Sequence, residues 1–350
     1  MVGIEPASMT AVFCQDAKDR SAETWKDQLE PFSCLEFAVS DAAKGIGAAV
    51  AWRAKAREID PSALALTHGL DVFHTAMEAK RVLAQHWRRA EAAWELAEVA
   101  AAEVAAAKQQ GIDARGAAVA ARAPWAGAIE RFEQAERLEL AWDRAHAALD
   151  LFTPDGRLND RDRATAEITE ALRDLTGPDW SKVRNFLNDP RSLAFLDRMH
   201  DRLETAEPRP DWREALAWRW WLCHRRPKPS DALTKLVRAV GREVTLSEPE
   251  QAAYARVAAV LEDTFRASSA VECMNSVLRM HQSRHRRMTQ PMLDLKRLYW
   301  NTRPFRSGPR KDVCPYQRLG LKLPTYDFWE LLQSDPKQLT QQLSTTGNTE

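Results

Sequence analysis

The sequence predicts a mostly helical protein that has a small α/β layer at its N-terminal end. Short apolar runs alternate with helical stretches over residues 1–75, and this order is typical of an α/β layer. Residues 76–265 are rich in Ala, Glu and Arg and show no strand pattern. Helical patterns return over 266–302, before a basic segment at 303–333 and a polar tail at 334–350.

Residues 1–75 are predicted to run strand, strand, helix, strand, helix, strand. The first two strands form a hairpin, because two short apolar runs flank the turn-forming sequence Glu-Pro-Ala-Ser. The sequence Asp-Arg-Ser ending at Ser21 marks a helix start, with Trp25 and Leu29 at helical spacing after it. The predicted strands are Val2–Ile4, Thr10–Cys14, Cys34–Val39 and Leu64–Phe73, and the second helix covers Ala42–Ala56.

Two long antiparallel helices are expected between Thr75 and Leu151, because residues 111–116 interrupt an otherwise continuous helical pattern. Shorter helices follow, separated by Gly-Pro, Asp-Pro and single Pro residues. Trp212 and Trp220 belong to an aromatic stripe at helical spacing, which favours packing inside this helical region.

The C-terminal part begins with two helices. Ser268-Ser269 caps a helix that runs to about Arg284, and Thr289-Gln290-Pro291 opens a second one that continues through Trp300. The segment 303–333 is a Pro- and Arg-rich loop that ends in a short helix at 326–332. The tail at 334–350 is rich in Gln, Ser and Thr and is predicted to be disordered.

Charge is balanced over the whole chain but concentrated locally. Fifty Lys and Arg match fifty Asp and Glu, so net charge alone indicates no class of partner. From Arg266 to Lys322, however, thirteen basic residues face three acids, an excess of ten positive charges. Such an asymmetry is typical of a nucleic-acid site, although a solvated basic face is the simpler alternative.

The cysteines and the apolar runs indicate a cytoplasmic protein. Five dispersed cysteines without a Cys-x-x-Cys pair predict neither a disulfide framework nor a zinc module. No apolar run reaches the roughly 18 residues of a membrane span, and residues 1–10 lack a signal-peptide pattern. We therefore expect no membrane partner.

Two carboxylates occupy positions where phosphodiester chemistry could use them. Asp41 follows a predicted strand, at the rim where ligands of open α/β sheets bind. Glu272 lies one turn into a predicted helix, with Asn275 and Arg279 at i+3 and i+7 on the same face. On spacing alone, a turn or helix cap at Asp41 and a solvated face at Glu272 are the commoner interpretations.

Several segments resemble a family of bacterial DDE-type DNA transposases with an RNase H-like core. The block SSAVECMNSVLRMHQSRHRRMTQPMLDLKRLYWN, from Ser268, looks like the family's region around its third catalytic residue. The basic segment RPFRSGPRKDVCPYQRLGLKLPTYDFWELL follows it, as in the family. VGIEPASM, DRSAETW and LEFAVSDAAKGI resemble the stretch leading to the second catalytic Asp, and LTHGLDVFHTAMEAKRVL resembles the entry to a long helical insertion.

The resemblance implies an RNase H-like core fragment at 1–75, an all-helical insertion at 76–265, and core helices at 266–302. It assigns the catalytic roles to Asp41 and Glu272, which would hold Mg²⁺ or Mn²⁺ at a two-metal site in an intact version. It also implies that an insertion tryptophan could stack on an unpaired base. The predicted DNA-binding residues are Asn275, Arg279, Arg284, Arg286, Arg287, Lys296, Arg297, Arg303, Arg306, Arg310 and Lys311.

The family's first catalytic Asp has no counterpart in this sequence, because it lies on a strand upstream of Val2–Ile4. We therefore expect a truncated transposase that binds element ends and target DNA in the nucleoid but is inactive in transposition. A homo-oligomer on DNA is the expected form of the complex. The alternative is a non-catalytic DNA-binding protein derived from a transposase.

Overall fold

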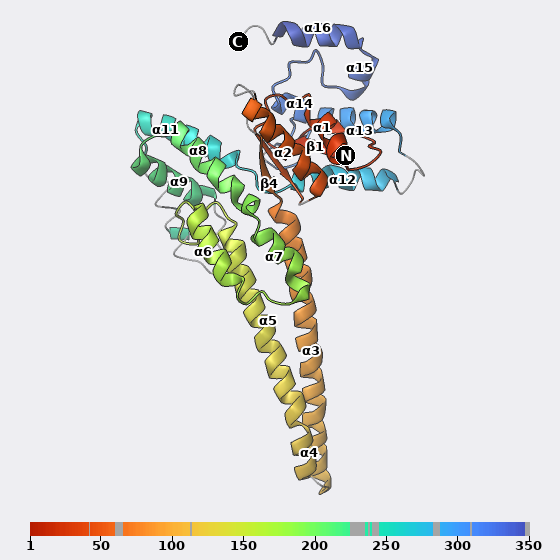
Figure 1. Ribbon diagram of the computed structural model, residues 1–350, viewed down its shortest axis with the longest axis vertical. Coiled ribbons are helices and arrows are strands. Elements are labelled where there is room, and N and C mark those ends of the chain that lie inside the picture. The colour runs from red at the N-terminus through yellow and green to blue at the C-terminus, as the bar shows by residue number, and fades with distance from the viewer. Residues whose placement is uncertain are drawn as a thin grey trace. The chain divides into compact units, whose positions relative to one another are not determined.

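A computed structural model describes residues 1–41, 43–59, 66–112, 114–224, 235–236, 239, 245–282, 288–308 and 310–346. Over these residues the chain is mostly helical with four short strands, which confirms the predicted balance (Figure 1). The chain divides into two compact units. Unit 1 combines Met1–His68 with Ala267–Glu350, and unit 2 is Gly69–Arg266.

Each observed strand overlaps a predicted one, and the strands form two separate two-stranded sheets. The predicted strand Leu64–Phe73 ends earlier than expected, because Val72 and Phe73 already belong to the helix α3 (Val72–Gln110). In the first sheet, β1 (Val2–Glu5) pairs antiparallel with β2 (Thr10–Cys14), with an irregularity in register between Gly3 and Ile4. In the second, β3 (Phe37–Ser40) pairs with β4 (Thr67–Leu70). Short apolar runs are enough to predict each strand, but not which strands share a sheet.

The helix α13 (Gln290–Thr302) covers the edge of β2 that β1 leaves free. Side chains of α13 form hydrogen bonds with backbone groups of β2 and of the residues next to it. In a larger sheet, a further strand would provide these hydrogen-bond partners. Asn301 bonds both backbone groups of Ala11, while the indole of Trp300 donates to the Met9 carbonyl at 2.8 Å. Gln290 bonds the Cys14 carbonyl and the Asp16 amide at 3.0 and 2.8 Å.

The other helices of unit 1 are α1 (Ala22–Leu29), α2 (Lys44–Ile59), α12 (Ser269–Gln282), α14 (Pro315–Arg318), α15 (Phe328–Gln333) and α16 (Pro336–Thr346). Ser21 caps α1 as predicted, because its hydroxyl accepts the amide hydrogen of Thr24. Two hydrophobic clusters stabilise the unit. One packs the β1–β2 hairpin against α12 and α13, and the other joins α1 to α2.

The tail differs from its predicted disorder over residues 336–346, which form α16. The prediction of disorder relied on the polar composition and overlooked the helix-start signal formed by Asp335 and Pro336. The Asp335 carboxylate accepts the amide hydrogen of Lys337 at 2.9 Å, and Pro336 occupies the first helical position, where a missing N–H costs nothing.

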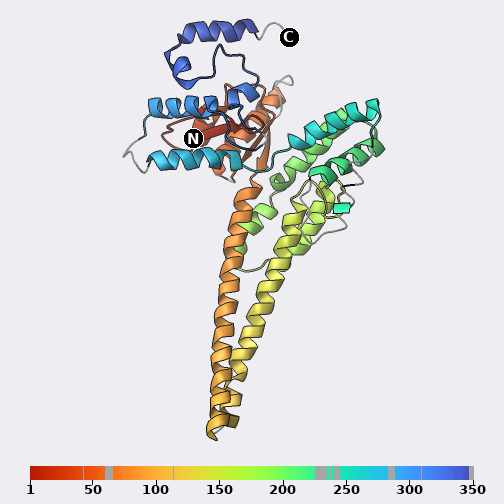
Figure 2. The same ribbon diagram turned by 180° about the vertical axis from the view of Figure 1, so that it is seen from behind.

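Unit 2 is built on two long helices, α3 (Val72–Gln110) and α5 (Arg122–Ala148), which run side by side in opposite directions (Figures 1 and 2). The short helix α4 (Ala114–Ala120) joins them at the far end. Gly111 ends α3 with a positive φ of 68°, a conformation that glycine adopts without steric cost. The predicted pair of long antiparallel helices is therefore confirmed.

Shorter helices complete unit 2, as predicted, around a core that includes Trp180, Leu196 and Met199. They are α6 (Arg161–Ala171), α7 (Ser181–Leu187), α8 (Ala194–Ala206), α9 (Pro210–His224) and α11 (Glu248–Glu262), with 3₁₀ turns at Pro178–Trp180 and Pro190–Leu193. On α9, Trp220 stacks between Phe152 and His224, which supports the packing interpretation for that ring. No described helix combines the length and apolar character needed to cross a bilayer.

Candidate nucleic-acid interface

Glu272 lies in the first turn of α12, where its carboxylate contacts both residues predicted to share its face. The Asn275 side-chain amide donates to one carboxylate oxygen at 3.2 Å, and the Arg279 guanidinium lies 3.4 Å from the other. Met274 and Leu278, on the same helix, are buried in the cluster beneath β1 and β2. This amphipathic pattern orients the polar group, so that 26% of the Glu272 side chain and 69% of the Arg279 side chain are exposed.

Asp41 directly follows β3 and is exposed, so it has the strand-end position expected from the sequence. The neighbouring Ser40 hydroxyl donates to the Asp41 backbone carbonyl at 2.7 Å and lies 2.7 Å from the ring Nε2 of His68. Ser40 and His68 are both buried, and they tie the end of β3 to β4. Sequence reasoning missed His68, because nothing in its local pattern reveals a partner 28 positions away.

The predicted Mg²⁺ site has Asp41 and Glu272 as its protein ligands. The described part of the chain contains no group of three or more His, Cys, Asp or Glu that could hold a metal ion. Both oxygens of Glu272 are also engaged, one by Asn275 and one by Arg279. Each of these oxygens keeps a second lone pair, so the two contacts orient the carboxylate without blocking a metal ion.

The predicted DNA-binding residues on and after α13 have different environments. Arg297 is half-buried and donates to the Val12 carbonyl at 3.2 Å, so its guanidinium supports β2 as well as adding charge. Lys296 and Arg303 make no ion pair with any described residue. Arg284, Arg286 and Arg287 lie outside the described residues.

A compact loop after α13 presents three more predicted residues, Arg306, Arg310 and Lys311. Phe305 bridges to Lys311 across the loop, and backbone hydrogen bonds join Phe305 to Asp312 and Val313 at 2.9 and 3.2 Å. Gly308 turns the chain with a φ of 79°. Because the loop is closed by its own backbone, its basic side chains are not needed to hold it together.

Most described cations between Arg266 and Lys322 are electrostatically unpaired. Arg266, Arg279 and Lys311 form ion pairs, whereas seven others form none with a described residue. Those seven are Lys296, Arg297, Arg303, Arg306, Arg310, Arg318 and Lys322. In unit 2, by contrast, ion pairs such as Arg161–Asp197 and Arg202–Asp263 are frequent among the described residues. The positive charge of this segment is therefore available to an external anion.

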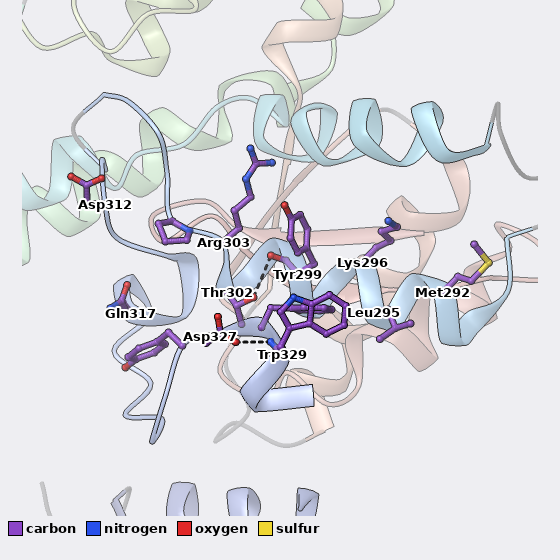
Figure 3. Close-up of a pocket in the computed structure, with 13 residues that line it drawn as sticks. Met292, Leu295, Lys296, Tyr299, Thr302, Arg303, Asp312, Gln317, Asp327 and Trp329 are labelled. Carbon is purple, nitrogen blue, oxygen red and sulfur yellow. Dashed lines mark hydrogen bonds between the residues drawn. The ribbon is translucent and has the colours of Figure 1, made fainter. Parts of the chain in front are cut away.

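An aromatic cluster beside these cations was missed by sequence reasoning. Tyr326, Phe328 and Trp329, from the segment around α15, line a cavity of about 800 Å³ together with residues of α13 (Figure 3). The sequence predicts a short helix there, but a helix of this length gives no pattern that identifies its partner. The signal that could have found the cluster is three aromatic rings within four residues.

Comparison with protein-family models, with curated proteins and with solved structures found no match to this chain. The functional proposal therefore depends on the geometry above and on the resemblance carried by the quoted motifs.

Proposed function

We propose that this chain is a DNA-binding protein of the DDE transposase lineage, whose segment from Arg266 to Lys322 contacts the phosphate backbone. The observation that carries the proposal is the set of seven described cations without an ion-pair partner. DNA presents regularly spaced phosphates, and cations that neutralise them release condensed counterions. Basic side chains that already have carboxylate partners would gain much less from such a contact.

The arrangement of the chain supports the transposase lineage. Unit 1 is made of two sequence segments separated by the whole of unit 2, as the resemblance implies for a core interrupted by an insertion. Asp41 and Glu272 come from different segments but belong to the same unit.

Salt dependence tests the DNA-binding proposal directly. If about six to ten phosphates are engaged, affinity for a duplex should fall by about 10³- to 10⁵-fold between roughly 50 and 200 mM salt. Replacing Arg306, Arg310 and Lys322 together by Ala should lower the slope of log affinity against log salt by about 3. A complex that is insensitive to salt, or no complex at low salt, would exclude this surface.

A matched control comes from unit 2. Arg81, Arg144 and Arg173 are exposed but paired with Glu78, Glu167 and Glu170. Replacing these three by Ala removes the same formal charge and should leave the salt slope unchanged. An equal loss in both triple variants would mean that net charge, and not this surface, drives binding.

The non-catalytic alternative makes a separate prediction about metal-dependent cleavage of DNA. We expect no Mg²⁺-dependent nicking of DNA by this chain, since two-metal chemistry needs a further carboxylate. Nicking that disappears in both Asp41→Ala and Glu272→Ala variants, with DNA binding retained, would instead establish a functional metal site.

A further inference from the structure

We propose that the cavity between α13 and α15 binds an unpaired nucleobase of DNA, a role that builds on the proposed DNA-binding function. The cavity has a volume of about 800 Å³, within the usual range of about 300 to 1,000 Å³ for small-molecule sites. It is lined by aromatic and aliphatic side chains and has two cations at its margin (Figure 3).

The aromatic wall leaves two rings available for stacking. Phe328 packs edge-on against both Tyr299 and Trp329, with centroid separations of 5.6 and 5.0 Å and interplanar angles of 86° and 74°. These contacts fix Phe328 and leave Tyr299 43% exposed and Trp329 65% exposed. Large aromatic rings are normally well buried, so an exposed pair at the margin of a cavity is a surface suited to stacking.

The wall is held in place from both sides. Asp327 caps α15, because its carboxylate accepts the amide hydrogens of Trp329 and Glu330 at 2.8 and 3.0 Å. The Tyr326 hydroxyl donates to the Leu321 carbonyl, and Leu331 of α15 is buried. The rings therefore project from an anchored turn, which limits the conformational entropy that a bound ligand would have to remove.

The charges at the cavity match a nucleotide better than an uncharged apolar ligand. Lys296 lies on α13 three positions before Tyr299, and Arg303 directly follows the last residue of that helix. Neither forms an ion pair with a described residue, and the Arg303 guanidinium lies 5.9 Å from the centre of the Tyr299 ring. The two acids of the lining are engaged, Asp327 by backbone amides and Asp312 by Lys311.

A nucleotide combines a planar base with an anionic phosphate, so it can use the rings and the cations together. Bases within a duplex are already stacked on their neighbours. The cavity should therefore select DNA that carries an unpaired nucleotide, such as a tailed or frayed end.

The test compares a blunt duplex with the same duplex carrying a short single-stranded tail that contains 2-aminopurine. The full chain should bind the tailed DNA more tightly and quench the 2-aminopurine fluorescence through stacking. Trp329→Ala and Tyr299→Ala should each weaken binding of the tailed DNA by about 5- to 150-fold, with blunt-duplex affinity unchanged. Trp329→Phe keeps a ring and should retain most of the preference.

Trp52→Ala is the matched control, because Trp52 is an exposed tryptophan of the same unit that does not line the cavity. Equal binding of tailed and blunt DNA, or a Trp329→Ala variant that retains the full preference, would overturn the base-binding proposal alone. Failure to bind any DNA at low salt would overturn the proposed DNA-binding function as well.

Discussion

Asn301 acts as a substitute for a neighbouring strand. It is 1% exposed, and its side-chain oxygen accepts the Ala11 amide hydrogen at 2.8 Å while its NH₂ group donates to the Ala11 carbonyl at 3.0 Å. An Asn side chain presents one acceptor and one donor group, the same pair that a strand backbone offers. This one residue therefore satisfies both backbone groups of a buried strand residue.

Replacing Asn301 by Ala should lower the free energy of unfolding of unit 1 by about 2 to 4 kcal/mol, because each unpaired buried backbone group costs about 1 to 3 kcal/mol. Asn301→Asp keeps an acceptor for the Ala11 amide hydrogen, but its ionised carboxylate cannot donate to the Ala11 carbonyl, so this variant should also be less stable than wild type at pH 7. Urea unfolding followed by tryptophan fluorescence measures both variants. A change below about 0.5 kcal/mol for Asn301→Ala would contradict this account.

Glu207 is a buried acid of unit 2 that forms ion pairs with two arginines. Its side chain is 1% exposed, and its oxygens lie 2.6 Å from the Arg209 Nε and 3.1 Å from the Arg256 guanidinium. The hydrogen bond from Arg209 lowers the pKa of Glu207 from 4.5 to about 2. The ionised carboxylate thus links the end of α8 to α9 and α11.

Because the folded-state pKa is lowered, the stability that Glu207 contributes is fully present above about pH 4.5 and is lost as pH falls toward about 2. Glu207→Gln should be less stable than wild type at pH 7, and the difference should shrink across that window. Thermal unfolding followed by circular dichroism at several pH values measures the difference. If it stays constant from pH 7 to pH 2, the charge of Glu207 does not carry the interaction.

At the scale of elements, the pairing of α3 and α5 depends on alanine. Ala90 and Ala97 on α3, and Ala128 and Ala135 on α5, are nearly inaccessible and are spaced by seven residues on each helix. Small side chains at this spacing allow two helices to approach closely along one seam. Trp87 and Trp94 pack edge-on against Phe132 and Trp125 of α5.

Ala90→Leu should destabilise unit 2 by about 1 to 3 kcal/mol, because the added methyl groups overpack the seam. Ala92→Leu, two positions away, places the same side chain on an exposed position and should change stability by less than about 0.5 kcal/mol. Thermal unfolding of both variants at equal protein concentration gives the two melting temperatures to be compared with wild type. Similar shifts for both variants would mean that helix propensity, not packing, controls this hairpin.

Local patterns predict the elements well and their tertiary partners poorly. The strands, the start of α1 at Ser21 and the extent of α13 follow from apolar periodicity and capping residues, which act within a few positions. Asn301 and Ala11, by contrast, are 290 positions apart, and no local pattern records their contact. The same limit explains Arg297, which was predicted as a DNA contact and also bonds the Val12 carbonyl.

One part of the candidate site could be predicted from local sequence patterns, and another part could not. Glu272, Asn275 and Arg279 meet as predicted, because positions three and seven apart share one face of a helix. The aromatic cavity could not be predicted, since α13 and α15 are separated by residues 303–327, which include α14. Contacts between elements so far apart in the chain depend on tertiary packing, and no local sequence pattern records them.

At the scale of the whole molecule, the chain enters and leaves unit 2 at one place. The Val72 amide donates to the Arg266 carbonyl at 3.0 Å, so the first residues of unit 2 are bonded to its last. Arg266 also bonds the Leu149 carbonyl and lies 3.2 Å from Asp150, at the end of α5. The buried core of Trp180, Leu196, Met199 and Leu203 belongs entirely to this unit.

A fragment comprising Gly69–Arg266 should therefore fold alone, because its buried core is its own and its ends are bonded to each other. It should give strong helical circular dichroism and one cooperative melt. The full chain should then show two transitions, of which Ala90→Leu shifts only the one seen in the fragment and Asn301→Ala shifts only the other. Because each variant should shift only one transition, the pair of variants shows whether the two units unfold independently. A fragment without cooperative unfolding, or variants that each shift both transitions, would show that the two units fold as one.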